Sequence, residues 1–176
     1  MAVLPLHIKI TFKRFGEVMV SLRTKILLAA ANLFGGLMAG MNIDRAIVAM
    51  PAWQQVGSLA WAVFSQKADL GNGLFLYPFE AIAGVLLNIG AILSYRFDRL
   101  KIPSKAWPLY LAVFLSIGGL LVTIKAAPIM LGVPQLAGDP VPIQNAFDGF
   151  NFWGGIRGVF QVSAFIAEIW AMATIL

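Results

Sequence analysis

The chain contains no cysteine and only one histidine, His7, among its 176 residues. The absence of cysteine excludes disulfides, thiolate nucleophiles and metal sites or clusters that need cysteine ligands. A single histidine cannot supply both axial ligands of a haem, nor the ligands of a histidine-rich metal site. We therefore predict that this chain holds no metal and no cofactor, and that His7 lies at the surface or the membrane interface.

Charged residues are also scarce. They make up 12% of the chain, against roughly 25% in soluble domains, whereas 60% of the residues are hydrophobic. This composition predicts an integral membrane protein in contact with the lipid bilayer, with loops too short to hold a second core. The formal net charge of +5 then matters through the position of the basic residues, and it does not indicate nucleic-acid binding.

Four apolar stretches are long enough to cross a bilayer, which takes about 20 residues for each helix. They predict an all-α fold, an integral membrane four-helix bundle that occupies residues 26–176. The helices are expected at about 26–50, 74–95, 107–131 and 150–176.

The segments outside these helices differ in character. Residues 1–25 are expected to form a cytoplasmic or interfacial segment with a short amphipathic helix. Apolar residues in the first loop, between 53 and 64, indicate a second interfacial helix. The third loop is expected to be irregular because it contains Pro134, Pro140 and Pro142.

Basic residues are distributed unevenly between the loops. They are frequent in the N-terminal segment and between 96 and 105, whereas the third loop has none. The positive-inside rule then places both termini and the second loop in the cytoplasm. We predict a multi-pass protein of the inner (plasma) membrane with cytoplasmic N- and C-termini.

Several charged side chains lie within the apolar stretches. At a rise of 1.5 Å per residue, Asp44, Glu80, Lys125 and Arg157 lie about 22–28 Å from the cytoplasmic edge. Because ionisable groups in hydrocarbon usually pair or mark a ligand path, we predict one layer in the outer leaflet. In it the two acids face the two bases. Arg45 would point about 100° away from Asp44 and reach the outer surface.

Small and polar residues recur along the faces of these helices. The first two helices are expected to pack along two ridges, Asn32-Gly36-Gly40-Asp44 and Glu80-Gly84-Asn88. On the fourth helix, Trp153 is spaced for a cation–π contact with Arg157. Glu168 is expected to serve helix packing or to lie at the inner interface.

Short motifs occur in a fixed order along residues 26–176. They are Gly35–Gly40 followed by Pro51, Asp69–Gly73 with Tyr77-Pro78, Thr123–Pro128, Phe150–Arg157, and Gln161–Phe165 followed by Trp170-Ala171. This order resembles a family of small four-helix bacterial membrane proteins of unknown function, related to the anthrone-oxygenase-like proteins.

The resemblance implies a particular chemistry. Some members of the wider family oxidise an anthrone methylene to the anthraquinone, with O2 as co-substrate and without a metal. The family's Trp-x-x-x-Arg segment matches Trp153 and Arg157. The piece before the last helix departs from the family pattern, because Pro142-Ile143-Gln144-Asn145 contains an additional glutamine.

Two functional hypotheses stay open beside a purely structural role for buried ion pairs such as Glu80–Arg157. The first is a cofactor-poor oxidoreductase or oxygenase that acts on an aromatic or lipophilic substrate. Glu80 or Asp44 would be its base, and Lys125 and Arg157 would hold the oxyanion. Its candidate substrate-binding residues are Trp153, Gln161, Asn42, Phe150 and Tyr77.

The second hypothesis is a protein without catalysis. The chain would bind a quinone, pigment or lipid in an outer-leaflet polar pocket, or it would be an accessory subunit of a larger membrane complex or a homo-oligomer. A transporter is disfavoured because the sequence shows neither an inverted repeat nor a broken-helix pattern.

Overall fold

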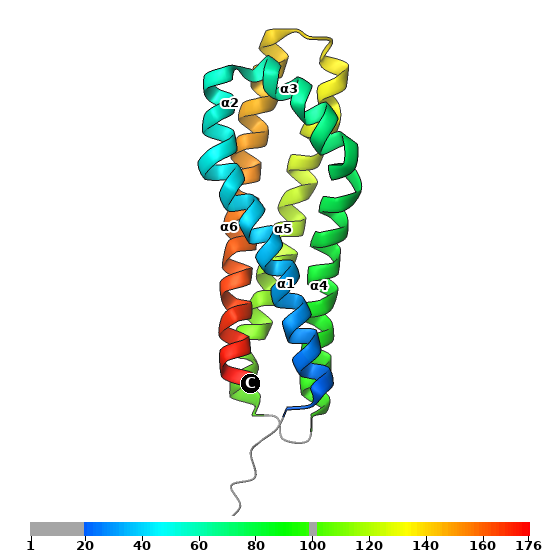
Figure 1. The fold of residues 1–176 in the computed structure, drawn as a ribbon, viewed down its shortest axis with the longest axis vertical. Helices are drawn as coiled ribbons and strands as arrows, with labels where there is room; N and C mark the ends of the chain where they lie inside the picture. The colour runs from blue at the N-terminus through cyan, green and yellow to red at the C-terminus, as the bar shows by residue number, and fades with distance from the viewer. Residues whose placement is uncertain (1–19, 99–101) are drawn as a thin grey trace, which may run out of the picture.

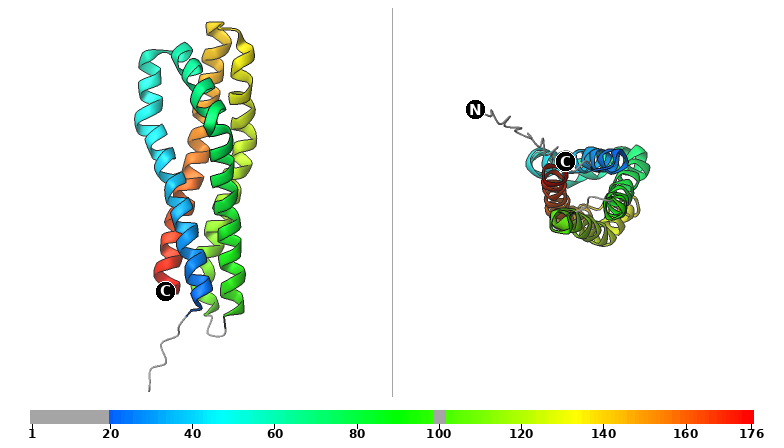
Figure 2. Two further views of the ribbon diagram at one scale, coloured as in Figure 1. Left: turned by 45° about the vertical axis from the view of Figure 1, so that its right-hand side comes forward. Right: turned by 90° about the horizontal axis from the view of Figure 1, so that it is seen from below.

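The structure, a computed structural model, describes residues 20–98 and 102–176. Most of the amphipathic segment expected at residues 1–25 therefore lies outside the described residues. The described part is entirely helical apart from short connections, and Figure 1 shows four long helical rods side by side. Seen along their length in Figure 2, the rods surround a common axis.

Each rod is long and apolar enough to cross a membrane. The first rod consists of α1 (Leu22–Asp44), η1 (Arg45–Ala49) and α2 (Met50–Val56), and the second of α3 (Ser58–Lys67), η2 (Ala68–Asn72) and α4 (Gly73–Phe97). The third rod consists of η3 (Pro103–Ala106), α5 (Trp107–Gly132) and η4 (Val133–Leu136), and the fourth is α6 (Pro140–Ile175). Large apolar side chains are exposed along all four rods, as contact with lipid requires. The predicted four-helix chain with four candidate spans is confirmed.

The helices extend further than expected, most clearly after α5. The third loop is largely helical, since Pro134 lies in η4 and Pro140 opens α6. Proline fits the first turn of a helix, where its missing N–H has no partner to lose. The Asp139 carboxylate caps α6 by accepting a hydrogen bond from the Val141 amide at 3.1 Å. The expected irregular loop is therefore reduced to residues 137–139.

The bundle has two ends, which we call basal and apical. At the basal end α1 begins, α4 ends, α5 begins and α6 ends; at the apical end α2 joins α3, and η4 is followed by α6 (Figure 1). Both described chain ends are thus basal, as a four-helix up-and-down order requires. The side of the membrane that each end faces stays a prediction.

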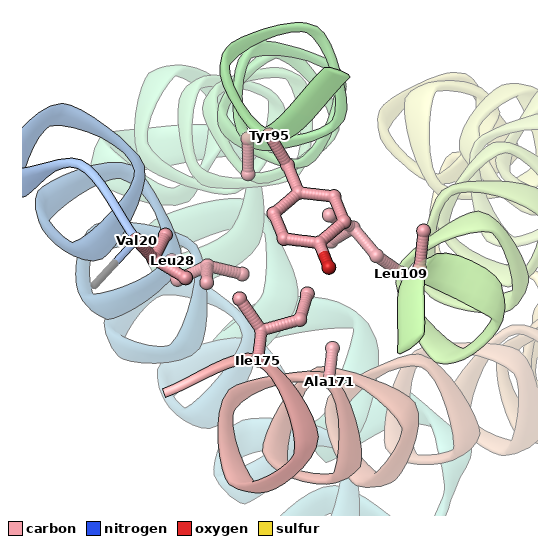
Figure 3. Packing of buried hydrophobic residues seen from close by; sticks show 8 residues of the cluster. Val20, Leu28, Tyr95, Leu109, Ala171 and Ile175 are labelled. Atoms are coloured by element: carbon pink, nitrogen blue, oxygen red, sulfur yellow. The ribbon is translucent and has the colours of Figure 1, made fainter. Parts of the chain in front are cut away.

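An apolar cluster closes each end of the bundle. The basal cluster has Tyr95 pointing inward between Leu28, Leu109 and Ile175 (Figure 3), and the Tyr95 hydroxyl donates to the Ile102 carbonyl at 3.0 Å. The apical cluster contains Met50, Trp61, Ala62, Met130, Val133, Ile143, Phe147 and Phe150. Between these clusters the interior carries most of the buried polar side chains discussed below.

The ridge of small residues on α1 faces α6 rather than α4. Asn32 Nδ2 donates to the Glu168 carbonyl at 3.4 Å, and a Cβ on Gly36 would lie 3.3 Å from the Phe165 ring. Gly84 of α4 does approach α1, at 4.0 Å from Phe34 Cβ, but it does not meet the α1 glycines. The predicted ridge-to-ridge packing of the first two helices is therefore wrong. Helical spacing shows which residues share a face, and not which neighbour that face meets.

Candidate functional site

The charged layer predicted from residue depth is not assembled as expected. Asp44 and Lys125 are exposed on the outside of the bundle, whereas Glu80 is buried inside it. Neither of the anticipated ion pairs, Asp44–Lys125 and Glu80–Arg157, forms within the described part of the chain. Residue counting fixes the height of a side chain along a helix, and the direction in which it points depends on helix rotation.

Arg45, expected to reach the outer surface, instead makes an ion pair inside the apical half. Its Nη2 lies 2.7 Å from Oδ1 of Asp69, whose side chain is only 9% exposed. The guanidinium also lies over two rings, 5.3 Å from the centroid of Phe150 and 5.8 Å from that of Tyr77. Arg45 begins the π-helical η1, and such wide turns rotate the following residues relative to an α-helix.

Arg157 completes this group, which we call the apical charge cluster: Arg45, Asp69, Tyr77, Phe150 and Arg157. The charge of Arg157 interacts electrostatically with Arg45, Asp69 and Tyr77. Its Nε is buried and has no hydrogen-bond partner among the described residues. The cluster thus contains two guanidinium groups and one carboxylate, so positive charge is in excess.

Trp153 does not have the predicted role of a partner for Arg157. The cation–π contacts found in the described residues are those of Arg45, and Trp153 packs edge-on against Phe152, with ring centroids 5.2 Å apart. Of the predicted binding residues, Tyr77 and Phe150 therefore join the cluster, and Trp153 does not.

A cavity of about 310 Å³, the lateral cavity, lies between the first rod and α6. The first rod diverges from α6 toward the apical end, as the left view of Figure 2 shows. On α6, Gly154 and Gly155 line the cavity and leave it open because they have no side chains. Its polar wall includes Asn42, Arg45 and Asn151, and most of its remaining wall is apolar.

Asn42 and Gln161 meet at the deep side of this cavity. Asn42 Nδ2 donates to Gln161 Oε1 at 2.5 Å and lies 2.6 Å from the carbonyl of Met38. Asn42 lines the lateral cavity, whereas Gln161 lines a second, deeper one. The structure thus brings these two predicted binding residues together as a partition between two cavities.

The second cavity, the deep cavity, has a volume of about 30 Å³ and is bounded by all four rods. Glu80 of α4 and Glu168 of α6 both line it, with side chains 8% and 2% exposed. Glu168 Oε1 accepts a hydrogen bond from Asn88 Nδ2 at 2.5 Å. Oε2 of each glutamate has no partner among the described residues.

Sequence reasoning missed two residues of these sites. Glu168 was expected to serve helix packing or to lie at the inner interface, and not to line a cavity with Glu80. Asp69 lies in a segment expected to be a loop. Its position beside an apolar stretch could have indicated a buried acid. Within the described residues, no group of three or more histidine, aspartate or glutamate side chains is placed to hold a metal ion.

Comparisons with protein-family models, with curated proteins and with solved structures found no match for this chain. The resemblance to the anthrone-oxygenase-like family therefore stays an expectation.

Proposed function

We propose that this chain is a multi-pass membrane protein that binds a lipophilic molecule with one anionic oxygen in the outer leaflet. The observation that carries this proposal is the lateral cavity, whose wall includes Arg45 of a charge cluster with two guanidinium groups and one carboxylate. An anionic ligand in the cavity balances the excess positive charge through Arg45, the guanidinium that lines it.

The lateral cavity supports this choice of ligand. Its volume of about 310 Å³ is at the lower end of small-molecule sites, so part of the ligand would extend into the surrounding lipid. Apolar walls accept hydrocarbon or aromatic rings, while Arg45 and Asn42 lie where a polar end would be held. A flat hydroxylated aromatic, with one ionised phenol or enol oxygen, fits this combination.

The distribution of basic residues supports the proposed placement in the outer leaflet. Arg23, Lys25, Arg96 and Lys105 lie toward the basal end, which the positive-inside rule assigns to the cytoplasm. The apical charge cluster then faces the opposite leaflet.

A binding titration tests the proposal. The protein in lipid nanodiscs would be titrated with a hydroxyanthraquinone and with its neutral methyl ether, and tryptophan fluorescence followed. Arg45→Gln should weaken binding of the ionised compound at least tenfold, which corresponds to about 1.4 kcal/mol. Lys125→Gln removes the same charge at an exposed position and should leave affinity unchanged. Equal affinities for all three proteins would reject the proposal.

Oxidation of such a ligand is the second candidate function. Its supporting observation is the unpartnered Oε2 of Glu80, which suits a base that removes a proton from a C–H between aromatic rings. Because Glu80 lines the deep cavity, the substrate would have to reach past Asn42 and Gln161. The protein should then consume O2 with an anthrone, and Glu80→Gln should abolish this. An unchanged rate in the variant would remove Glu80 from the mechanism.

An accessory role is distinguished by purification in mild detergent. A stoichiometric protein partner would favour a subunit of a larger membrane complex. Purification of the chain alone with a bound aromatic compound would favour the binding function proposed above.

A further inference from the structure

Two glutamates share a cavity in the middle of this bundle, and this cavity begins about one helical turn below Tyr77 and Arg157 of the apical charge cluster. Glu80 and Glu168 approach it from α4 and α6, and both are more than nine-tenths buried. The other helices contribute Phe34, Gly35 and Met38 from α1 and Ser116 and Leu120 from α5. Within the described part of the chain, its lining therefore contains no lysine, arginine or histidine to balance the two acids.

The buried polar atoms that lack a hydrogen-bond partner around this cavity are all acceptors. Glu80 Oε2, Glu168 Oε2 and Asn88 Oδ1 are buried without a donor in the described structure. Within the described residues, Asn88 Nδ2 donates a hydrogen bond only to Glu168 Oε1. Protonation of a carboxylate converts one of its oxygens from an acceptor into a donor. A proton on either glutamate therefore supplies a hydrogen-bond donor, which the unpartnered acceptors around this cavity lack.

The surroundings make two ionised carboxylates costly at this position. The apical and basal clusters close the bundle above and below the cavity, and burial of unpaired charge in apolar surroundings costs several kcal/mol or more. The cavity of about 30 Å³ has room for one water molecule, which needs two to four polar partners. Glu80, Ser116, Gln161 and Glu168 are the polar residues that line this cavity.

We propose that Glu80 and Glu168 are two membrane-embedded proton-binding groups that line one cavity, and that at least one of their carboxyl groups carries a proton at neutral pH. A metal ion is the weaker alternative, because Ca²⁺ takes six to eight oxygen ligands and Mg²⁺ six. This site does not depend on the ligand proposed for the lateral cavity.

Dicyclohexylcarbodiimide is the first probe, since it reacts with protonated carboxyl groups in apolar surroundings. The carboxyl proton passes to a carbodiimide nitrogen and the carboxylate oxygen bonds to the central carbon, so the whole reagent is added. Mass spectrometry of the protein in detergent at pH 7 should find the adduct on Glu80 or Glu168. Asp139 and Asp148, which are exposed, are internal controls and should stay unmodified.

Two results would overturn this proposal. The first is no modification of either glutamate. The second is protection by sodium or calcium chloride at constant ionic strength, because it would show a cation site in place of a proton site.

Infrared spectroscopy gives a second measurement that does not require the reagent to enter the bundle. The spectrum at pH 7 should contain the C=O band of a protonated carboxyl group. Glu168→Gln and Glu80→Gln keep side-chain size, and at least one of them should lose that band. If the wild type and both variants give identical spectra in this region, both carboxyl groups are ionised and the proposal fails.

Discussion

The carboxylate of Asp69 and the guanidinium of Arg45 join the π-helical turn η1 to η2, where the helix is kinked at Gly71, through a contact of 2.7 Å. Arg45 opens η1 in the first rod, and Asp69 lies in η2 of the second. Single π-helical turns are frequent at functional sites. The pair links the two rods near the apical end, and it holds the guanidinium where it also faces Tyr77 and Phe150.

Breaking this ion pair should destabilise the protein. Arg45→Gln leaves the buried Asp69 carboxylate without its counter-ion, and we expect a loss of about 2–4 kcal/mol in the free energy of unfolding. The double variant with Asp69→Asn should lose less than the sum of the single variants, by about 1–3 kcal/mol. Reversible unfolding in mixed micelles measures all four proteins. Strictly additive losses would show that the two side chains do not interact in the membrane.

Substitutions of Gly35 and Gly40 on α1 together test where the Glu168 side chain lies. A Cβ at Gly35 would overlap the Glu168 carboxylate, whereas one at Gly40 would have no described atom within 4 Å. We expect Gly35→Ala to cost about 1–3 kcal/mol, because Glu168 must leave its contact with Asn88. Gly40→Ala should change stability by less than about 0.5 kcal/mol. The same unfolding assay applies, and equal effects of both substitutions would place Glu168 elsewhere.

The helix count was predictable from the sequence because it depends on composition and length alone. The directions of the charged side chains were not. The sequence places Asp44 and Glu80 at similar depths, yet one is exposed to the outside and the other lines the deep cavity. Their directions depend on the rotation of each helix about its own axis, which is set by packing against neighbours.

The π-helical turn η1 interrupts the regular residue count in the first rod. A residue inserted at η1 changes the direction of every side chain that follows, so a count in steps of 3.6 fails there. Arg45 comes before this change and keeps its offset of about 100° from Asp44, so it faces Asp69 because Asp44 points outward. No sequence pattern used above marks a π-helical turn. Asn42 comes before η1 and Gln161 lies on α6, and their side chains meet at 2.5 Å, while their role in binding stays a prediction.

The Asn42–Gln161 contact should matter for stability, since it separates the two cavities. Asn42→Leu removes the donor to Gln161 Oε1 and leaves that buried acceptor unpaired, at a cost of about 1–3 kcal/mol. The exposed pair Gln144–Asp148 is a control with the same kind of contact, 3.0 Å long. Gln144→Leu should stay within about 0.5 kcal/mol of the wild type. A smaller loss for Asn42→Leu than for this control would contradict the assigned partition.

Orientation in the membrane can be measured with introduced cysteines, because the natural chain has none to react in the background. Ser104→Cys marks the basal end and Gln135→Cys the apical end, and both positions are exposed. In sealed right-side-out vesicles, a membrane-impermeant maleimide should modify the cysteine at position 135. It should modify the one at position 104 only after the membrane is opened with detergent, because the positive-inside rule places that end in the cytoplasm. The reverse labelling pattern would move the apical charge cluster to the inner leaflet, and the lipophilic anion would then have to be sought there.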